Sequence, residues 1–155
     1  MNEQASIPQQ QAMLSTKDLV MRTLRDIGCN PYVNEQDDNR IDFHYQGGYF
    51  FIATHDKLAF IDLYFAWWYD APLDDIDALS AIQKAVNKAN CKNIGCNVMY
   101  TIHQKEGIVR VHSRSQLLFL PDIRYMDLYL TEKLQELLKV RHDVVIAIRT
   151  EIAMQ

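Results

Sequence analysis

The sequence contains few cysteines, which can cross-link a chain, and few prolines and glycines, which interrupt helices and strands. Its 155 residues include three cysteines, four prolines and five glycines. The cysteines are an odd number, and no second pair follows Cys91 and Cys96 at the spacing of a zinc site. We therefore expect Cys29, Cys91 and Cys96 to be reduced and mostly buried thiols, not members of a disulfide framework.

Long apolar runs are also absent, and none is long enough to cross a bilayer. The N-terminal stretch MNEQASIPQQQ lacks the charged and then apolar regions of a signal peptide, which favours a cytoplasmic location. The formal net charge is −4, so the chain has no general attraction to phosphate backbones or anionic lipid. We expect neither a nucleic-acid nor a membrane partner.

Catalytic and metal-binding motifs are missing as well. GxSxG, the P-loop and GxGxxG do not occur, and no two histidines have an HxH or HxxxH spacing. The sequence thus predicts no enzyme, no cofactor and no metal site. A catalytic group built from residues far apart in the chain would leave no motif, so that alternative stays open.

The residues that are present suit one ordinary domain, with 48% hydrophobic and 23% charged residues. Residues 1–13 are polar and glutamine-rich, which predicts a disordered tail before a single α+β domain over 14–155. Helical periodicity predicts a first helix over about 16–28, which Ser15 or Thr16 can cap and Gly28 can end. Acidic residues at the start and lysines toward the end favour a second helix over 74–91.

A third helix is predicted from Pro121-Asp122 to about residue 152, with Asp122 as its cap. Unbroken, it would be longer than a domain of this size needs. Either it breaks near Arg141, before the β-branched run that follows, or its distal half meets a second subunit.

Between the first two helices, alternating apolar residues predict a three-stranded antiparallel meander. Gly47-Gly48 is a strong two-residue turn, which would pair Tyr45 with Phe50, and a second turn falls near His55-Asp56. This register puts one set of side chains in the core and the other on the reverse face. The core set is Ile41, Phe43, Tyr45, Phe50, Ile52, Ala59, Ile61, Leu63, Phe65 and Trp67, and the reverse set includes Phe51, Phe60, Asp62, Tyr64, Ala66 and Trp68.

A second hairpin is expected after the second helix, and it pairs Ile102 with Val109. Val109 and Val111 then face inward. The element order is therefore α-β-β-β-α-β-β-α, an α+β domain with a five-stranded antiparallel sheet. The order of the strands within the sheet is left open.

This order resembles the type III secretion chaperone fold and the YbjN-like family that shares it. The resemblance covers residues 16–152 and rests on the stretches FHYQGGYFFI…LAFIDLYFAWWYD, LDDIDALSAIQKAVNKANCKNIGCNVMY and MDLYLTEKLQELLKV. It implies a non-enzymatic protein-binding module of chaperone or regulatory type, often a homodimer. The basic outer face of the second hairpin departs from the family pattern.

Two surfaces are candidate binding sites. Phe51, Phe60, Tyr64 and Trp68 would form an aromatic patch for a protein segment or a second copy of the chain, unless the last helix covers them. Arg110, His112 and Arg114 project from alternate positions of one strand beside Lys105, where they would form either an anion- or nucleic-acid-binding patch or an ordinary solvated face. The second surface supports the alternative function, a small-ligand or anion-binding protein.

Overall fold

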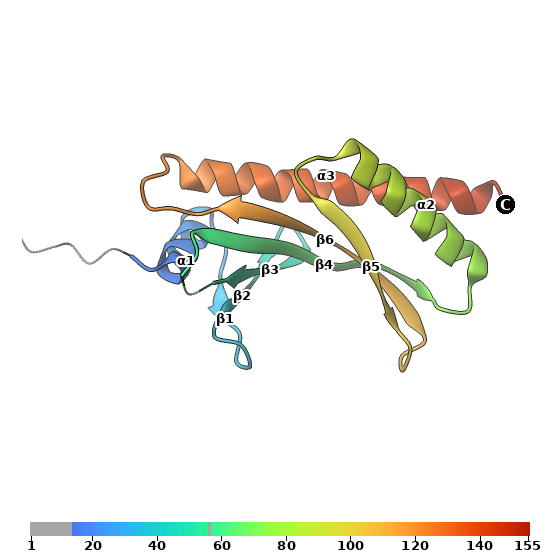
Figure 1. Ribbon diagram of the computed structural model, residues 1–155, viewed down its shortest axis with the longest axis horizontal. Helices are drawn as coiled ribbons and strands as arrows, with labels where there is room; N and C mark the ends of the chain where they lie inside the picture. Colours follow the sequence, from blue (N-terminus) through green and yellow to red (C-terminus); the bar gives the residue numbers. More distant parts are fainter. Residues whose placement is uncertain (1–13, 56) are drawn as a thin grey trace, which may run out of the picture.

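The computed structural model describes residues 14–155 apart from residue 56, so the predicted tail over 1–13 lies outside the described residues. Its centre is one antiparallel sheet with the strand order β1-β2-β3-β4-β6-β5 (Figure 1). The strands are β1 (Tyr32–Val33), β2 (Arg40–Tyr45), β3 (Gly48–Thr54), β4 (Phe60–Pro72), β5 (Asn97–His103) and β6 (Ile108–Leu118). The α+β class is confirmed, and the predicted strand count of five is one too low. The missed strand, β1, has two residues directly after Pro31, too short to show alternation.

Three helices accompany the sheet: α1 (Thr16–Asp26), α2 (Ile76–Lys92) and α3 (Met126–Ala153). The first two begin where a side chain caps them. Ser15 Oγ accepts the Asp18 N–H at 3.1 Å, and the Asp75 carboxylate accepts the Ala78 N–H at 2.9 Å. The prediction that Asp122 caps α3 is wrong. Tyr125 precedes this helix with φ +56° and makes no side-chain cap.

The helix α3 runs without a break through Arg141, so the predicted interruption does not occur. Figure 1 shows α2 lying across the distal half of α3 on one side of the sheet. Val140, Val144 and Ile148 of that half are buried within the chain's own core. The length of α3 is therefore explained by its packing on α2 and no longer indicates a second subunit.

The helices cover one face of the sheet, which we call the covered face. Its core includes Ile41, Phe43, Phe50, Ile52, Ile61, Leu63 and Phe65, all at most 1% exposed, as the alternation predicted. Leu24 of α1 and Leu134 of α3 are fully buried in the same core. The opposite side, which we call the open face, carries the alternate residues of the same strands.

The first hairpin turns at Gln46-Gly47, one residue earlier than predicted. These two residues have φ of +46° and +76°, and Tyr45 pairs with Gly48. A β-carbon on Gly48 would come within 2.8 Å of ring atoms of Phe50 and Phe65, so this glycine leaves space for stacked rings. The register differs from the predicted one by two residues, and an even shift leaves the side chains of β2 and β3 on their expected faces.

A bulge in β4 reverses the predicted roles of the two tryptophans. Phe65 pairs with Ser113 of β6 and Tyr69 with Val111, so three residues of β4 lie opposite one residue of β6. Trp67, at φ +44°, lies on the open face and is 49% exposed. Trp68 packs against the covered core, where its Nε1 donates to Ser113 Oγ at 3.4 Å. The assignments of Trp67 to the core and of Trp68 to the reverse face are therefore wrong.

Candidate functional site

The open face carries a row of stacked side chains that crosses four strands. The Arg40 guanidinium of β2 lies 4.0 Å from the centroid of the Phe51 ring in β3. The rings of Phe51 and Tyr64 of β4 are 4.5 Å apart and tilted by only 14°, and Arg114 of β6 lies 5.7 Å from the Tyr64 centroid. We call these four residues the central row. An arginine covers each end of the row, so the rings are only partly exposed.

A second row lies beside the central row. The rings of Tyr49 and Trp67 are 5.9 Å apart, and the Arg110 guanidinium is 5.8 Å from the Trp67 centroid. Arg110 also donates to Glu106 at 2.7 Å. The bulge puts Trp67 in this row, since a regular strand would place residue 66 opposite Tyr49. Trp67 is therefore held by neighbours on both sides while half of its surface faces outward.

Two buried carboxylates anchor the arginines of the central row. Asp42 accepts hydrogen bonds from Asn34 at 2.7 Å, Arg40 at 2.8 Å and Tyr49 at 2.6 Å. Burial alone would raise the pKa of Asp42, but these hydrogen bonds together outweigh burial and hold it below its ordinary value. The carboxylate is ionised and fully bonded at neutral pH, which suits a structural anchor better than a general acid.

Asp62 plays the same part on β4. It lies 2.9 Å from His55 Nε2 and 2.7 Å from the Arg114 guanidinium. Burial again acts to raise the pKa of Asp62, and the bonds to His55 and Arg114 bring it below its ordinary value. Each arginine of the central row thus meets a ring on one side and a carboxylate on the other.

The predicted aromatic patch is found in part. Phe51 and Tyr64 are adjacent on the open face, and Phe60 lies near the end of this face opposite Leu118, the two being 44% and 39% exposed. Trp68 does not belong to the patch. Trp67 was missed because nothing in its own strand signals a bulge that depends on pairing with β6.

The predicted basic residues Arg110, His112 and Arg114 do alternate along the open side of β6. They do not form a free positive patch, because Arg110 and Arg114 are paired with Glu106 and Asp62. Burial, and secondly the neighbouring His103, lower the pKa of His112. Its Nδ1 is buried without a hydrogen-bond partner in the described part of the chain. The aromatic and basic candidates are thus one surface, because β4 and β6 are neighbours.

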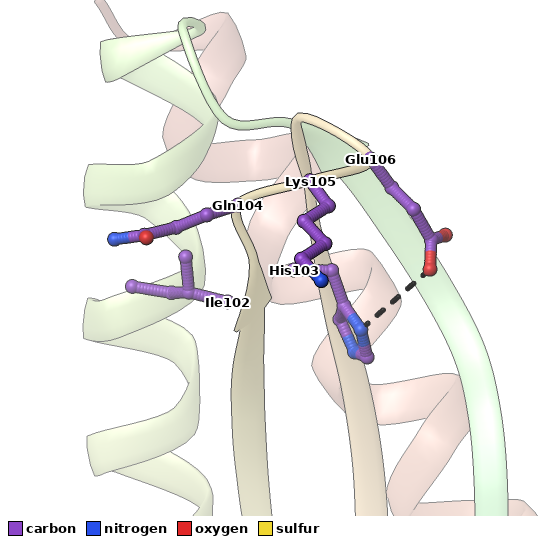
Figure 2. Close-up of a pocket in the computed structure, with 5 residues that line it drawn as sticks. All are labelled: Ile102, His103, Gln104, Lys105 and Glu106. Atoms are coloured by element: carbon purple, nitrogen blue, oxygen red, sulfur yellow. Dashed lines mark ion pairs between the residues drawn. The ribbon is translucent and has the colours of Figure 1, made fainter.

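A hollow beside the tip of the β5–β6 hairpin does not form a binding site. The hollow has a volume of about 360 Å³ and is lined by five consecutive residues, 102–106. Figure 2 shows Ile102 and Gln104 projecting to one side of the hairpin and Glu106 to the other, with His103 Nδ1 3.9 Å from Glu106. These side chains diverge, so they offer no convergent set of groups for a ligand.

The described residues show no metal cluster, and their three cysteines are free thiols of which only Cys96 is buried, so the expectation that they are mostly buried is wrong for the exposed Cys91. No group of three or more histidine, cysteine or acidic side chains among them is placed to hold a metal ion. Burial raises the pKa of Cys96 to about 11, so its thiol is protonated and unreactive at neutral pH. Of the described helices, none combines the length and apolarity needed to span a bilayer.

The fold defines a class: an α+β protein with one antiparallel sheet, helices on one of its faces and an open aromatic face on the other. The YbjN-like fold predicted from the sequence is confirmed. The chain is similar to the crystal structure of YbjN from E. coli, which is described as "a putative transcription regulator". The TM-score is 0.54, the identity is 11%, and the likeness covers 90% of this chain and 93% of that one.

No family model matches the chain, and no curated protein matches it either. At 11% identity the likeness to YbjN shows the fold alone. The resemblance to type III secretion chaperones stays a prediction.

Proposed function

We propose that this chain is a non-enzymatic protein-binding module that binds through the open face of its sheet, and that its first partner is a second copy of itself. The observation that carries the proposal is the placement of Trp67. This side chain is half exposed on a face that the described helices leave uncovered, and Tyr49 and Arg110 hold it in place.

The composition of the open face supports protein binding. Tryptophan, tyrosine and arginine are the residues most enriched among those that dominate binding energy at protein interfaces. Here they are already fixed by stacking and ion pairs, so association would cost little side-chain entropy. Phe60 and Leu118 extend the exposed apolar surface toward one end of the face.

The charges of the open face support self-association. Arg40 is paired with Asp42, Arg114 with Asp62 and Arg110 with Glu106, so the face is close to neutral. Two copies could therefore pack sheet against sheet, about 10 Å apart, without strong repulsion. A segment of another protein is the other occupant that this surface would fit.

A regulatory role agrees with the description of YbjN, and in this chain it would act through protein contacts. The formal net charge is −4, and the arginines of the open face are engaged in ion pairs. Direct binding to a phosphate backbone needs free lysines and arginines, so this face is poorly suited to it. The same ion pairs weigh against the alternative of an anion-binding protein, because an anion would have to compete with Asp62 and Glu106.

Analytical ultracentrifugation over a range of protein concentrations tests the proposal. We expect the wild-type protein to dimerise and Trp67→Asp to raise the dissociation constant at least about tenfold, while its circular dichroism stays unchanged. Ile94→Asp is the matched control, because Ile94 is fully exposed outside the open face. A wild-type protein that stays monomeric throughout, or a Trp67→Asp protein that dimerises equally well, would refute self-association through this face.

A further inference from the structure

A second surface lies away from the open face, on the helical side of the molecule. A groove of about 680 Å³ runs between the later part of α2 and the distal half of α3. The two helices are antiparallel here, because Lys84 of α2 pairs with Glu151 of α3 while Lys92 and Lys139 lie toward the other end. Figure 1 shows α2 crossing the distal half of α3, the half that ends at the C-terminus.

The groove exists because small residues line its floor. Ala85 and Ala89 of α2 are one helical turn apart, and they lie with Val140 and Val144 of α3 along the bottom, all at most 7% exposed. Above them, Ile146 is 49% exposed on the wall of the groove. An alanine opposite a valine leaves a channel that larger side chains would have filled.

The rim of the groove is positively charged. Lys84, Lys88 and Lys92 recur every four residues along one stripe of α2, and Lys139 faces them from α3. With Asp143 and Glu151 included, the lining carries a net charge of +2, although the whole chain carries −4. Lys88 and Lys92 form no ion pair with any residue that the structure describes.

We propose that the α2–α3 groove binds an acidic amphipathic helix of a partner protein. The apolar floor takes the apolar stripe of such a helix, and the lysine rim pairs with acidic residues on its flanks. From Lys139 to Met154 the groove follows α3 for about 22 Å at 1.5 Å per residue, which matches a partner helix of about four turns.

A second copy of the chain fits this groove less well than an acidic helix. In a symmetric dimer the same surface of each copy meets the other, so two linings that each carry a net positive charge would be brought together. A nucleic acid would satisfy the lysines but would leave the alanine and valine floor without a matching surface. The inference does not depend on the open face, which lies on the other side of the sheet.

Fluorescence anisotropy with synthetic peptides tests the proposal. The probe is a labelled 16-residue helix with leucine at every third or fourth position and glutamate on both flanks. We expect it to bind the full-length protein at least about tenfold more tightly than two matched peptides, one with lysine for glutamate and one with serine for leucine. Equal binding of the serine peptide would show a mere polyanion surface and would overturn the proposal, as would no binding of the probe.

Protein variants locate the site. Lys88→Glu/Lys92→Glu and, separately, Ile146→Asp should each weaken probe binding at least about tenfold. The matched controls are Lys57→Glu/Lys105→Glu and Ile94→Asp, which change exposed residues elsewhere and should bind like wild type. Trp67→Asp should also bind like wild type, so failure of the open-face proposal is distinguishable from failure of this one. Unchanged binding by the groove variants, or dimerisation abolished by them, would contradict the proposal.

Discussion

Each face of the meander carries a stacked aromatic pair, but the two pairs are stabilised in different ways. On the covered face the rings of Phe50 and Phe65 stack 4.2 Å apart. On the open face the next pair of residues along the same two strands, Phe51 and Tyr64, stacks 4.5 Å apart. The first pair is sealed under the helices, and the second ends in Arg40 and Arg114. Aromatic residues in a strand therefore do not by themselves show which face belongs to the core. On a face without helices, arginines held by carboxylates can cover the rings.

The largest expected difference between the faces is in the free energy of unfolding lost when phenylalanine is replaced by alanine at the neighbouring positions 50 and 51. Phe50→Ala should lower the free energy of unfolding by about 3–5 kcal/mol, because it leaves a cavity beneath the helices. Phe51→Ala should cost only about 1–2 kcal/mol, the worth of one aromatic pair and one cation–π contact. Urea denaturation measures both. Equal costs would mean that the open face is packed like the core.

A smaller difference between the stabilities of the two faces should appear when the pH is lowered, because the central row of the open face depends on charged groups. The folded-state pKa of Asp62 lies below its ordinary value, so its contribution is complete above about pH 4 and is lost as the pH falls through the folded pKa. Asp62→Asn should cost about 1–2 kcal/mol at pH 7, and its difference from wild type should shrink below about pH 4.

Urea denaturation at pH 7 and at pH 3 checks this expectation. Asp122→Asn, at an exposed position before α3, serves as the control for loss of one carboxylate. The cost of Phe50→Ala should be the same at both pH values. A cost of Asp62→Asn that does not change with pH would show that the carboxylate does not hold the central row through its charge.

The sequence predicted the parts of the fold that depend on local pattern. Alternation correctly placed Phe43, Phe50, Ile61 and Leu63 in the core. This assignment is right although the predicted turn lies one residue too late, because the resulting register error is two residues and an even error keeps each side chain on the same face. The start of α1 followed from Ser15 and its bond to the Asp18 N–H. Pairing of Ile102 with Val109 also came out as expected.

What the sequence could not predict depends on partners far along the chain. The bulge at Trp67 exists only because β4 pairs with β6, a strand about 45 residues away, so alternation assigned both tryptophans to the wrong face. The same pairing puts Arg114 beside Tyr64 and Asp62, which joined two candidate sites into one and neutralised the arginines. The alanines that form the α2–α3 groove were read only as part of a helix, since a groove appears when two helices meet.

The most direct test of the central claim follows the tryptophans one at a time. Acrylamide quenching of Trp68→Phe reports Trp67 alone, and Trp67→Phe reports Trp68 alone. We predict that Trp67 is readily quenched in dilute protein and becomes protected as the concentration rises, while Trp68 is shielded at every concentration. A Trp67 that stays equally accessible at all concentrations, or a Trp68 that is the more accessible of the two, would contradict the account.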